Sequence, residues 1–151
     1  MEYRPELPTL DKAIAEKQRL EQAEAAARAN GDEAGARSLR AMTERQTRLV
    51  SRLRQLPDDP HYPLDVELRR IGDAWWLSVP GEHYSLLQTE LRRRFPGHPL
   101  IIATIANGWG PSYLPTRETY GKGIYQESIA IVAPGSLERI VEEVSRAISG
   151  S

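Results

Sequence analysis

The chain places a carboxylate directly after an apolar run of strand length. Pro80 and Gly81 follow the run 74–79 and lead to Glu82. Loops that follow buried strands are where α/β folds hold their sites, so Glu82 is a candidate site residue. Helix capping is the alternative, and the local pattern alone favours it. The three histidines of the chain, with Glu82, match no metal-ligand spacing; they are His61, His83 and His98.

A second candidate loop runs from Asn107 to Thr116, after the apolar run 100–106. Long loops that contain glycine are usually functional or disordered in compact domains, and the aromatic content here argues against disorder. The alternative is that the aromatic residues of this region only cover the edge of a sheet. They are Trp109, Tyr113, Tyr120 and Tyr125.

Composition excludes several classes of protein. The chain has no cysteine, which excludes a disulfide scaffold, a thiolate zinc site and a cysteine nucleophile. It carries 20 basic and 21 acidic residues, and this balance argues against nucleic-acid binding by bulk charge. The sequence lacks a P-loop and the GxGxxG, HExxH and GxSxG motifs. No run is long enough for a transmembrane segment, and the first residues do not resemble a signal peptide.

Residues 1–56 are predicted to form a helical hairpin arm. Residues 10–56 contain no proline, tryptophan or tyrosine. Thr9 is a good N-cap, and Asn30-Gly31 breaks the helical run, so we expect helices from about 10 to 29 and from about 33 to 55. Leucines and Met42 recur at helical spacing in the second helix. The arm could pack or mediate an oligomer.

The proline-rich segment 57–63 is predicted to be a linker, and 64–151 a compact α/β part. Apolar patterns predict helices at 83–94 and from about 136 to 148. We expect a mixed β-sheet of about four strands with helices packed on it. The strand ending at Val79 should pair in parallel with the one ending at Ala106, through a right-handed crossover. The four predicted strands are 65–71, 74–79, 100–106 and 127–133.

The order of these features resembles the C-terminal part of the neutral ceramidase family, in its bacterial neutral/alkaline non-lysosomal branch. The resemblance covers most of residues 20–148. It rests on the strand 72–79 leading into Pro80-Gly81-Glu82 and on the residues that follow the second apolar run. Those residues are Asn107-Gly108, Tyr113-Leu114-Pro115-Thr116, Tyr120 and Gly123-Ile124-Tyr125. The Pro-Gly-Glu motif alone is a weak sign of this family, but the motifs of the two loops at this distance from each other are fairly specific to it.

The resemblance implies a zinc amidase that hydrolyses the N-acyl bond of ceramide or a related lipid amide. By position, Glu82 and Tyr113 match zinc ligands of the family, and Tyr125 matches the tyrosine that bonds to the reacting amide or its oxyanion. Asn107, Gly108 and Thr116 would support the loop. In the family, two histidines of the N-terminal part complete the metal site, and the parent protein would be secreted or periplasmic.

Two departures from the family shape the functional hypothesis. The histidine-bearing part is missing, and Gln126 stands where the family often has glutamate. We therefore expect a C-terminal fragment that needs the missing N-terminal part of the same polypeptide, is inert alone and binds zinc weakly. The alternatives are a truncated relative without activity, a structural or interaction module that docks through its hairpin, and a small-ligand binder that uses the aromatic loop.

Overall fold

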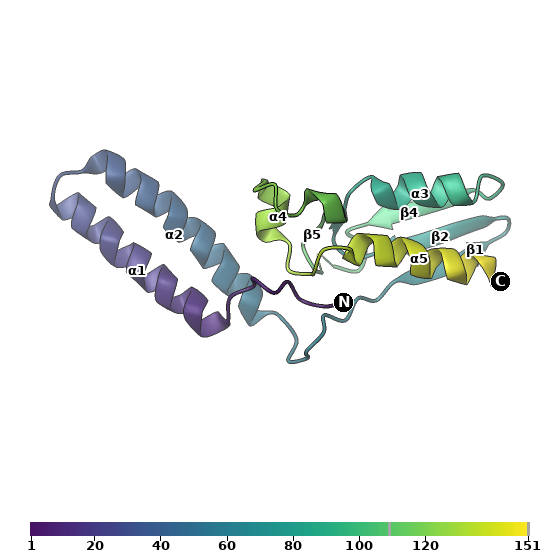
Figure 1. Ribbon diagram of the computed structural model, residues 1–151, viewed down its shortest axis with the longest axis horizontal. Helices are drawn as coiled ribbons and strands as arrows, with labels where there is room; N and C mark the ends of the chain where they lie inside the picture. Colours follow the sequence, from purple (N-terminus) through teal and green to yellow (C-terminus); the bar gives the residue numbers. More distant parts are fainter. Residues whose placement is uncertain (109, 151) are drawn as a thin grey trace. The chain divides into compact units, whose positions relative to one another are not determined.

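The computed structural model describes residues 1–108 and 110–150, and they form two units. The unit Glu6–Asp58 is the predicted helical hairpin, with α1 at Leu10–Ala29 and α2 at Glu33–Arg54 (Figure 1). Thr9 caps α1, since its Oγ1 accepts a hydrogen bond from the Lys12 amide at 3.4 Å. Asp32 caps α2 by accepting from the Gly35 amide at 2.8 Å. Both predicted helices are confirmed, and local capping explains where each begins.

The hairpin has a small apolar core of its own. Ala13 from α1 packs with Val50 and Leu53 from α2, and five further aliphatic side chains lie against this cluster: Leu7, Leu10, Ile14, Leu49 and Leu56. Gln46 of α2 lies between the leucines and Met42 that recur at helical spacing, and it donates from Nε2 to the Ala13 carbonyl at 2.9 Å. Met42 of the same stripe is 46% exposed. The hairpin therefore buries apolar surface within itself without using the whole stripe.

The second unit, Met1–Pro5 with Asp59–Ser151, is built on a three-stranded sheet. Its strands are β1 (Glu67–Ile71), β2 (Ala74–Val79) and β4 (Leu100–Thr104), in the order β1-β2-β4. β1 and β2 pair antiparallel, and β2 and β4 pair in parallel, with Val79 opposite Thr104. The predicted parallel pairing is confirmed. A second, two-stranded sheet joins β3 (Glu82–His83) to β5 (Tyr113–Leu114).

Two helices cover one face of the three-stranded sheet. α3 (Leu86–Arg94) connects β2 and β3 to β4, and α5 (Ser136–Ser149) closes the chain. Arg94 of α3 reaches Glu142 of α5 at 2.5 Å and Ser145 at 3.2 Å, so the two helices lie side by side (Figure 1). The core between helices and sheet is aliphatic and includes Leu77, Leu87, Leu91, Leu137, Ile140 and Val141. The fold is α+β, as the sequence predicts.

The predicted strand at 127–133 is wrong. Residues Tyr125–Ile129 form the short helix α4, and Val132 makes only an isolated antiparallel bridge with Tyr3. The Glu127 carboxylate accepts hydrogen bonds from the amides of Gly121 and Gly123 at 2.9 and 2.8 Å. These local bonds hold the segment in a compact loop and helix, which an apolar pattern alone does not reveal.

The chain's first residues, Met1–Pro5, belong to the α+β unit, although the sequence predicts them to be part of the arm. Glu2 bridges to His61 and Tyr3 to Val132, and the Arg4 amide donates to the Ile131 carbonyl at 3.0 Å.

A 3₁₀ turn, η1 (Arg117–Thr119), precedes α4. Among the described residues, no helix is both long and apolar enough to cross a membrane.

Candidate functional site

The short sheet β3–β5 brings two predicted site residues together. Glu82 lies directly opposite Tyr113 in the parallel register. The Glu82 amide donates to the Ser112 carbonyl at 2.8 Å, and the Tyr84 amide donates to the Leu114 carbonyl at 3.2 Å. Residues paired across adjacent strands project their side chains to the same face, so Glu82 and Tyr113 are neighbours. The two residues that the resemblance matches to zinc ligands therefore lie close together.

Gly81 is what allows this pairing. Its φ is +86°, in the left-handed region, and a Cβ there would lie 2.8 Å from Leu114 Cδ1 and 2.9 Å from the Ser112 carbonyl oxygen. Gly110 is similar on the facing loop, because a Cβ on it would lie 2.9 Å from Pro80 Cβ. A side chain at either position would push the loop away from β3. The glycine of Pro-Gly-Glu is therefore a geometric requirement for placing Glu82 beside Tyr113.

Tyr125 completes a cluster of one carboxylate and two phenols. It begins α4, and its ring lies edge-on to that of Tyr113, with centroids 6.1 Å apart and planes at 70°. The Tyr125 side chain is 61% exposed, so its hydroxyl is available to a ligand. All three candidate residues, Glu82, Tyr113 and Tyr125, thus lie in one place.

Burial and the neighbouring carboxylate keep Tyr113 protonated. Desolvation of its hydroxyl raises the pKa above the ordinary value of 10.0, and the charge and hydrogen-bonding contact of Glu82 raise it further. Tyr125 and Tyr84 act in the same direction. Near neutral pH the phenol is therefore a hydrogen-bond donor beside a carboxylate. It can bind a metal as a phenolate only if the metal displaces its proton.

The remaining loop residues support the cluster without joining it. Asn107 and Gly108 have φ of +61° and +112°, and the Gly108 carbonyl accepts from the Gly81 amide at 3.4 Å. Thr116 Oγ1 lies 2.8 Å from Thr119 Oγ1, in the turn that ends the loop. The Gly108 contact holds the start of the loop next to the residue that precedes β3, and the Thr116 contact is local to the turn.

Of the described aromatic residues whose alternative role is only to cover the edge of a sheet, Tyr120 is the one with a purely structural contact. The Tyr120 hydroxyl donates to the Val132 carbonyl at 3.0 Å, and burial raises its pKa to about 12. Its role is therefore structural. Trp109 lies outside the described residues.

His83 does not begin a helix, so this expectation is wrong. It belongs to β3, where successive side chains alternate between faces, and α3 begins only at Leu86, after Ser85. Long-range pairing with β5 prevails over the local helical pattern. Because Glu82 lies in the same strand, its interpretation as a helix cap is also wrong.

The His83 imidazole is held neutral in the interior. Its Nδ1 lies 3.1 Å from the Gly81 carbonyl, so Nδ1 carries the proton and donates. Nε2 is buried, with no hydrogen-bond partner among the described residues. Burial lowers the pKa of His83 to about 4. No local sequence pattern indicates that position 83 is covered, so sequence reasoning does not find this histidine.

The donor set fits part of a zinc site. A carboxylate and a phenol are oxygen donors that zinc accepts, but a catalytic zinc needs about three protein ligands. Within residues 1–108 and 110–150, no group of three or more His, Cys, Asp or Glu side chains is arranged to hold a metal ion. The described residues thus offer Glu82 and Tyr113, and further ligands would have to come from elsewhere.

Comparisons of the chain with family models, with curated proteins and with solved structures gave no match. The geometry of the cluster and the two loop motifs that form it are therefore what bears on function.

The Tyr113 pKa should fall when the Glu82 charge is removed. In Glu82→Gln, ionised Tyr113 no longer faces a second negative charge, so its pKa should move down toward 10.0 while burial still holds it above that value. NMR titration of ring-labelled tyrosine, assigned with Tyr113→Phe, measures this. Glu90→Gln, on α3, is the matched control and should leave the Tyr113 pKa unchanged. An unchanged pKa in Glu82→Gln would contradict the contact.

The stability of the α+β unit should fall in acid because of His83. The unfolded imidazole titrates near 6.5 and the folded one near 4, so the unfolded chain binds more protons between these values. This contribution is fully present above pH ~6.5 and is lost as the pH falls through ~4, by about 3 kcal/mol. Urea denaturation followed by tryptophan fluorescence should show a smaller acid loss in His83→Gln than in the parent. His98→Gln, at an exposed position, should retain the full loss; equal behaviour of the two variants would refute the assignment.

Proposed function

We propose that this chain forms part of a zinc amidohydrolase similar to neutral ceramidases, which hydrolyses the N-acyl bond of ceramide or a related lipid amide. The observation that carries the proposal is the cluster of Glu82, Tyr113 and Tyr125. Glu82 and Tyr125 are more than forty positions apart in the sequence, and the close approach at Gly81 allows Glu82 to pair with Tyr113. These are the positions that match the family's site by motif.

Each side chain suits its proposed role. Glu82 and Tyr113 are adjacent oxygen donors on one face of β3–β5, so both can reach one metal ion. When bound, zinc would acidify a water molecule and polarise the amide carbonyl. Tyr125 lies edge-on to Tyr113 and is largely exposed, so its hydroxyl can donate to the oxygen that becomes negative during hydrolysis.

Ligand number explains why the chain should be inert alone. Two donors leave the shell incomplete, and the raised pKa of Tyr113 adds a proton that the metal must displace. The proposal therefore includes a histidine-bearing part of the same polypeptide, which supplies the remaining ligands. The chain would act as the C-terminal portion of that protein.

The test joins the chain to the histidine-bearing part and measures zinc-dependent release of sphingosine from N-acylsphingosine. The joined protein should be active, whereas the chain alone should show no hydrolysis and only weak zinc binding by calorimetry. Glu82→Gln and Tyr113→Phe should each lower activity by roughly 100-fold or more, because each removes a direct ligand. Glu118→Gln and Tyr62→Phe, outside the cluster, are the matched controls and should keep most of it.

Two results would overturn the proposal. One is an active joined protein in which Glu82→Gln and Tyr113→Phe behave like their controls. The other is tight one-to-one zinc binding by the isolated chain that Glu82→Ala abolishes, because the chain would then hold a complete site.

A second candidate is a non-catalytic interaction module that docks through its hairpin. It is favoured by the separate apolar core of the Glu6–Asp58 unit and by the exposed Met42 on α2. In that case light scattering should show concentration-dependent self-association, weakened by Met42→Glu and not by Ala34→Glu. A monomer at all concentrations would speak against self-docking through this surface.

A further inference from the structure

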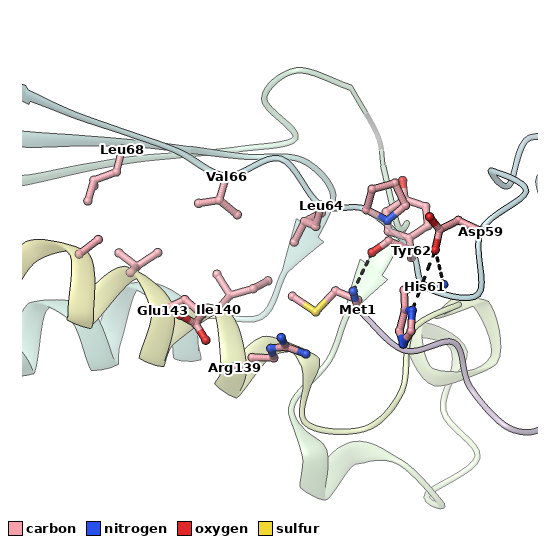
Figure 2. A pocket seen from close by; sticks show the side chains of 13 residues that line it. Met1, Asp59, His61, Tyr62, Leu64, Val66, Leu68, Arg139, Ile140 and Glu143 are labelled. Carbon is pink, nitrogen blue, oxygen red and sulfur yellow. Dashed lines mark hydrogen bonds and ion pairs between the residues drawn. The ribbon is translucent and has the colours of Figure 1, made fainter.

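A groove in the α+β unit lies apart from the Glu82 cluster. It has a volume of about 530 Å³ and runs between the segment 64–68 and α5 (Figure 2). None of Glu82, Tyr113 and Tyr125 lines it. Its size falls in the range of small-molecule sites.

The two long walls of the groove are aliphatic. On one wall, Leu64, Val66 and Leu68 alternate along an extended segment and therefore project to the same side. Figure 2 shows these three side chains facing α5. The opposite wall is a stripe on α5 made by Ile140, Val144 and Ala147. From Ile140 to Ala147 the helix rises about 10 Å, which sets the length of the apolar part.

Polar groups gather at one end of the groove. Figure 2 shows Arg139 and His61 on either side of Met1, away from Leu68. The acidic side chains of the lining are already engaged. Asp59 accepts from the His61 amide at 2.7 Å, with its carboxylate 4.0 Å from His61 Nδ1, and Glu143 pairs with Arg146 at 3.1 Å.

Arg139 is the group left for a ligand. Its guanidinium makes no hydrogen bond or ion pair with any residue in 1–108 or 110–150, although its amide donates to the Gly135 carbonyl as part of α5. A guanidinium presents a planar fork of donors that matches a carboxylate. The groove thus has a cationic end and an aliphatic body.

We propose that this groove binds a medium-chain aliphatic carboxylate, with its headgroup on Arg139 and its chain between the 64–68 segment and α5. An extended alkyl chain advances about 1.3 Å per C–C bond, so a chain of roughly eight to nine carbons spans the apolar stripe of α5. This proposed site is independent of the proposed hydrolase function. The Met1 amino group has no role in ligand binding in this proposal.

Calorimetry with a series of ligands tests both ends of the site. From hexanoate to octanoate the affinity should rise by about fourfold per methylene, because each added CH₂ is buried. Octanol and octylamine carry the same tail without an anion and should bind at least tenfold more weakly than octanoate. Acetate, the headgroup without the tail, should show no binding.

Variants place the ligand. Arg139→Gln should weaken octanoate binding by about tenfold or more, with a smaller effect on octanol. Ala147→Trp fills the apolar end from an exposed position and should weaken octanoate more than hexanoate. Arg92→Gln makes the same charge change on α3, outside the groove, and should bind like the parent. Circular dichroism melts confirm that each variant is folded.

Three results would overturn the proposal. The first is an absence of octanoate binding by the folded chain. The second is octylamine binding as tightly as octanoate, which would show that the charge of the headgroup is irrelevant. The third is octanoate binding that neither Arg139→Gln nor Ala147→Trp weakens, which would place the ligand elsewhere.

Discussion

The close approach of Gly81 to the loop before β5 is the constraint on which the site depends. The Ile105 amide donates to the Gly81 carbonyl at 2.9 Å, and the Ala106 amide donates to the Val79 carbonyl at 3.1 Å. These bonds extend the parallel β2–β4 pairing past the strand ends and bring two loops into contact. The space at Gly81 is too small for a Cβ, so the backbones can pair only with glycine there. Without that pairing, Glu82 and Tyr113 would lie on separate loops.

The same strand separates two kinds of chemistry. Because β3 alternates, Glu82 faces Tyr113 on one side while His83 lies on the other, among Tyr84, Ser85 and Gln88 around a cavity of about 330 Å³. The carboxylate keeps its phenol neighbour protonated by adding negative charge, whereas burial keeps the imidazole uncharged. The two adjacent residues Glu82 and His83 therefore lie in different environments, one beside a phenol and the other in a buried position. The alternation of the strand causes this difference, and their local sequence does not.

The sequence predicts an element correctly where the contacts that determine it are made between residues close together in the chain. Thr9 and Asp32 cap their helices through residues three positions on, so the hairpin is readable from its own segment. The β2–β4 pairing also follows from order, since a helix between two apolar runs favours a parallel crossover. The strand pattern of 127–133 does not predict its structure, because the amides of Gly121 and Gly123 in the preceding loop donate to the Glu127 carboxylate. The helical pattern at His83 is also misleading, because His83 pairs with β5, thirty residues away, and so forms a strand instead of the first turn of a helix.

The Glu82–Tyr113 approach was predictable in kind, because both residues follow strands that were expected to be neighbours. Tyr125 could be placed beside them only through the family resemblance, since α4 was not foreseen. The groove at α5 depends on a contact between an extended segment and a helix more than seventy positions later. No pattern in either segment specifies that contact, so only the folded structure shows it.

The first residues of the chain connect the cluster to the groove. Arg4 donates from Nη1 to the carbonyls of Glu127 and Ala130, and its guanidinium lies 5.6 Å from the Tyr120 ring centroid. Arg4 thereby fixes the end of α4, the helix that begins with Tyr125. Three residues earlier, Met1 lines the groove, and its amino group donates to the Tyr62 carbonyl at 2.7 Å. One extended segment therefore braces both places, because its backbone bridges to residues 61 and 132 hold it between them.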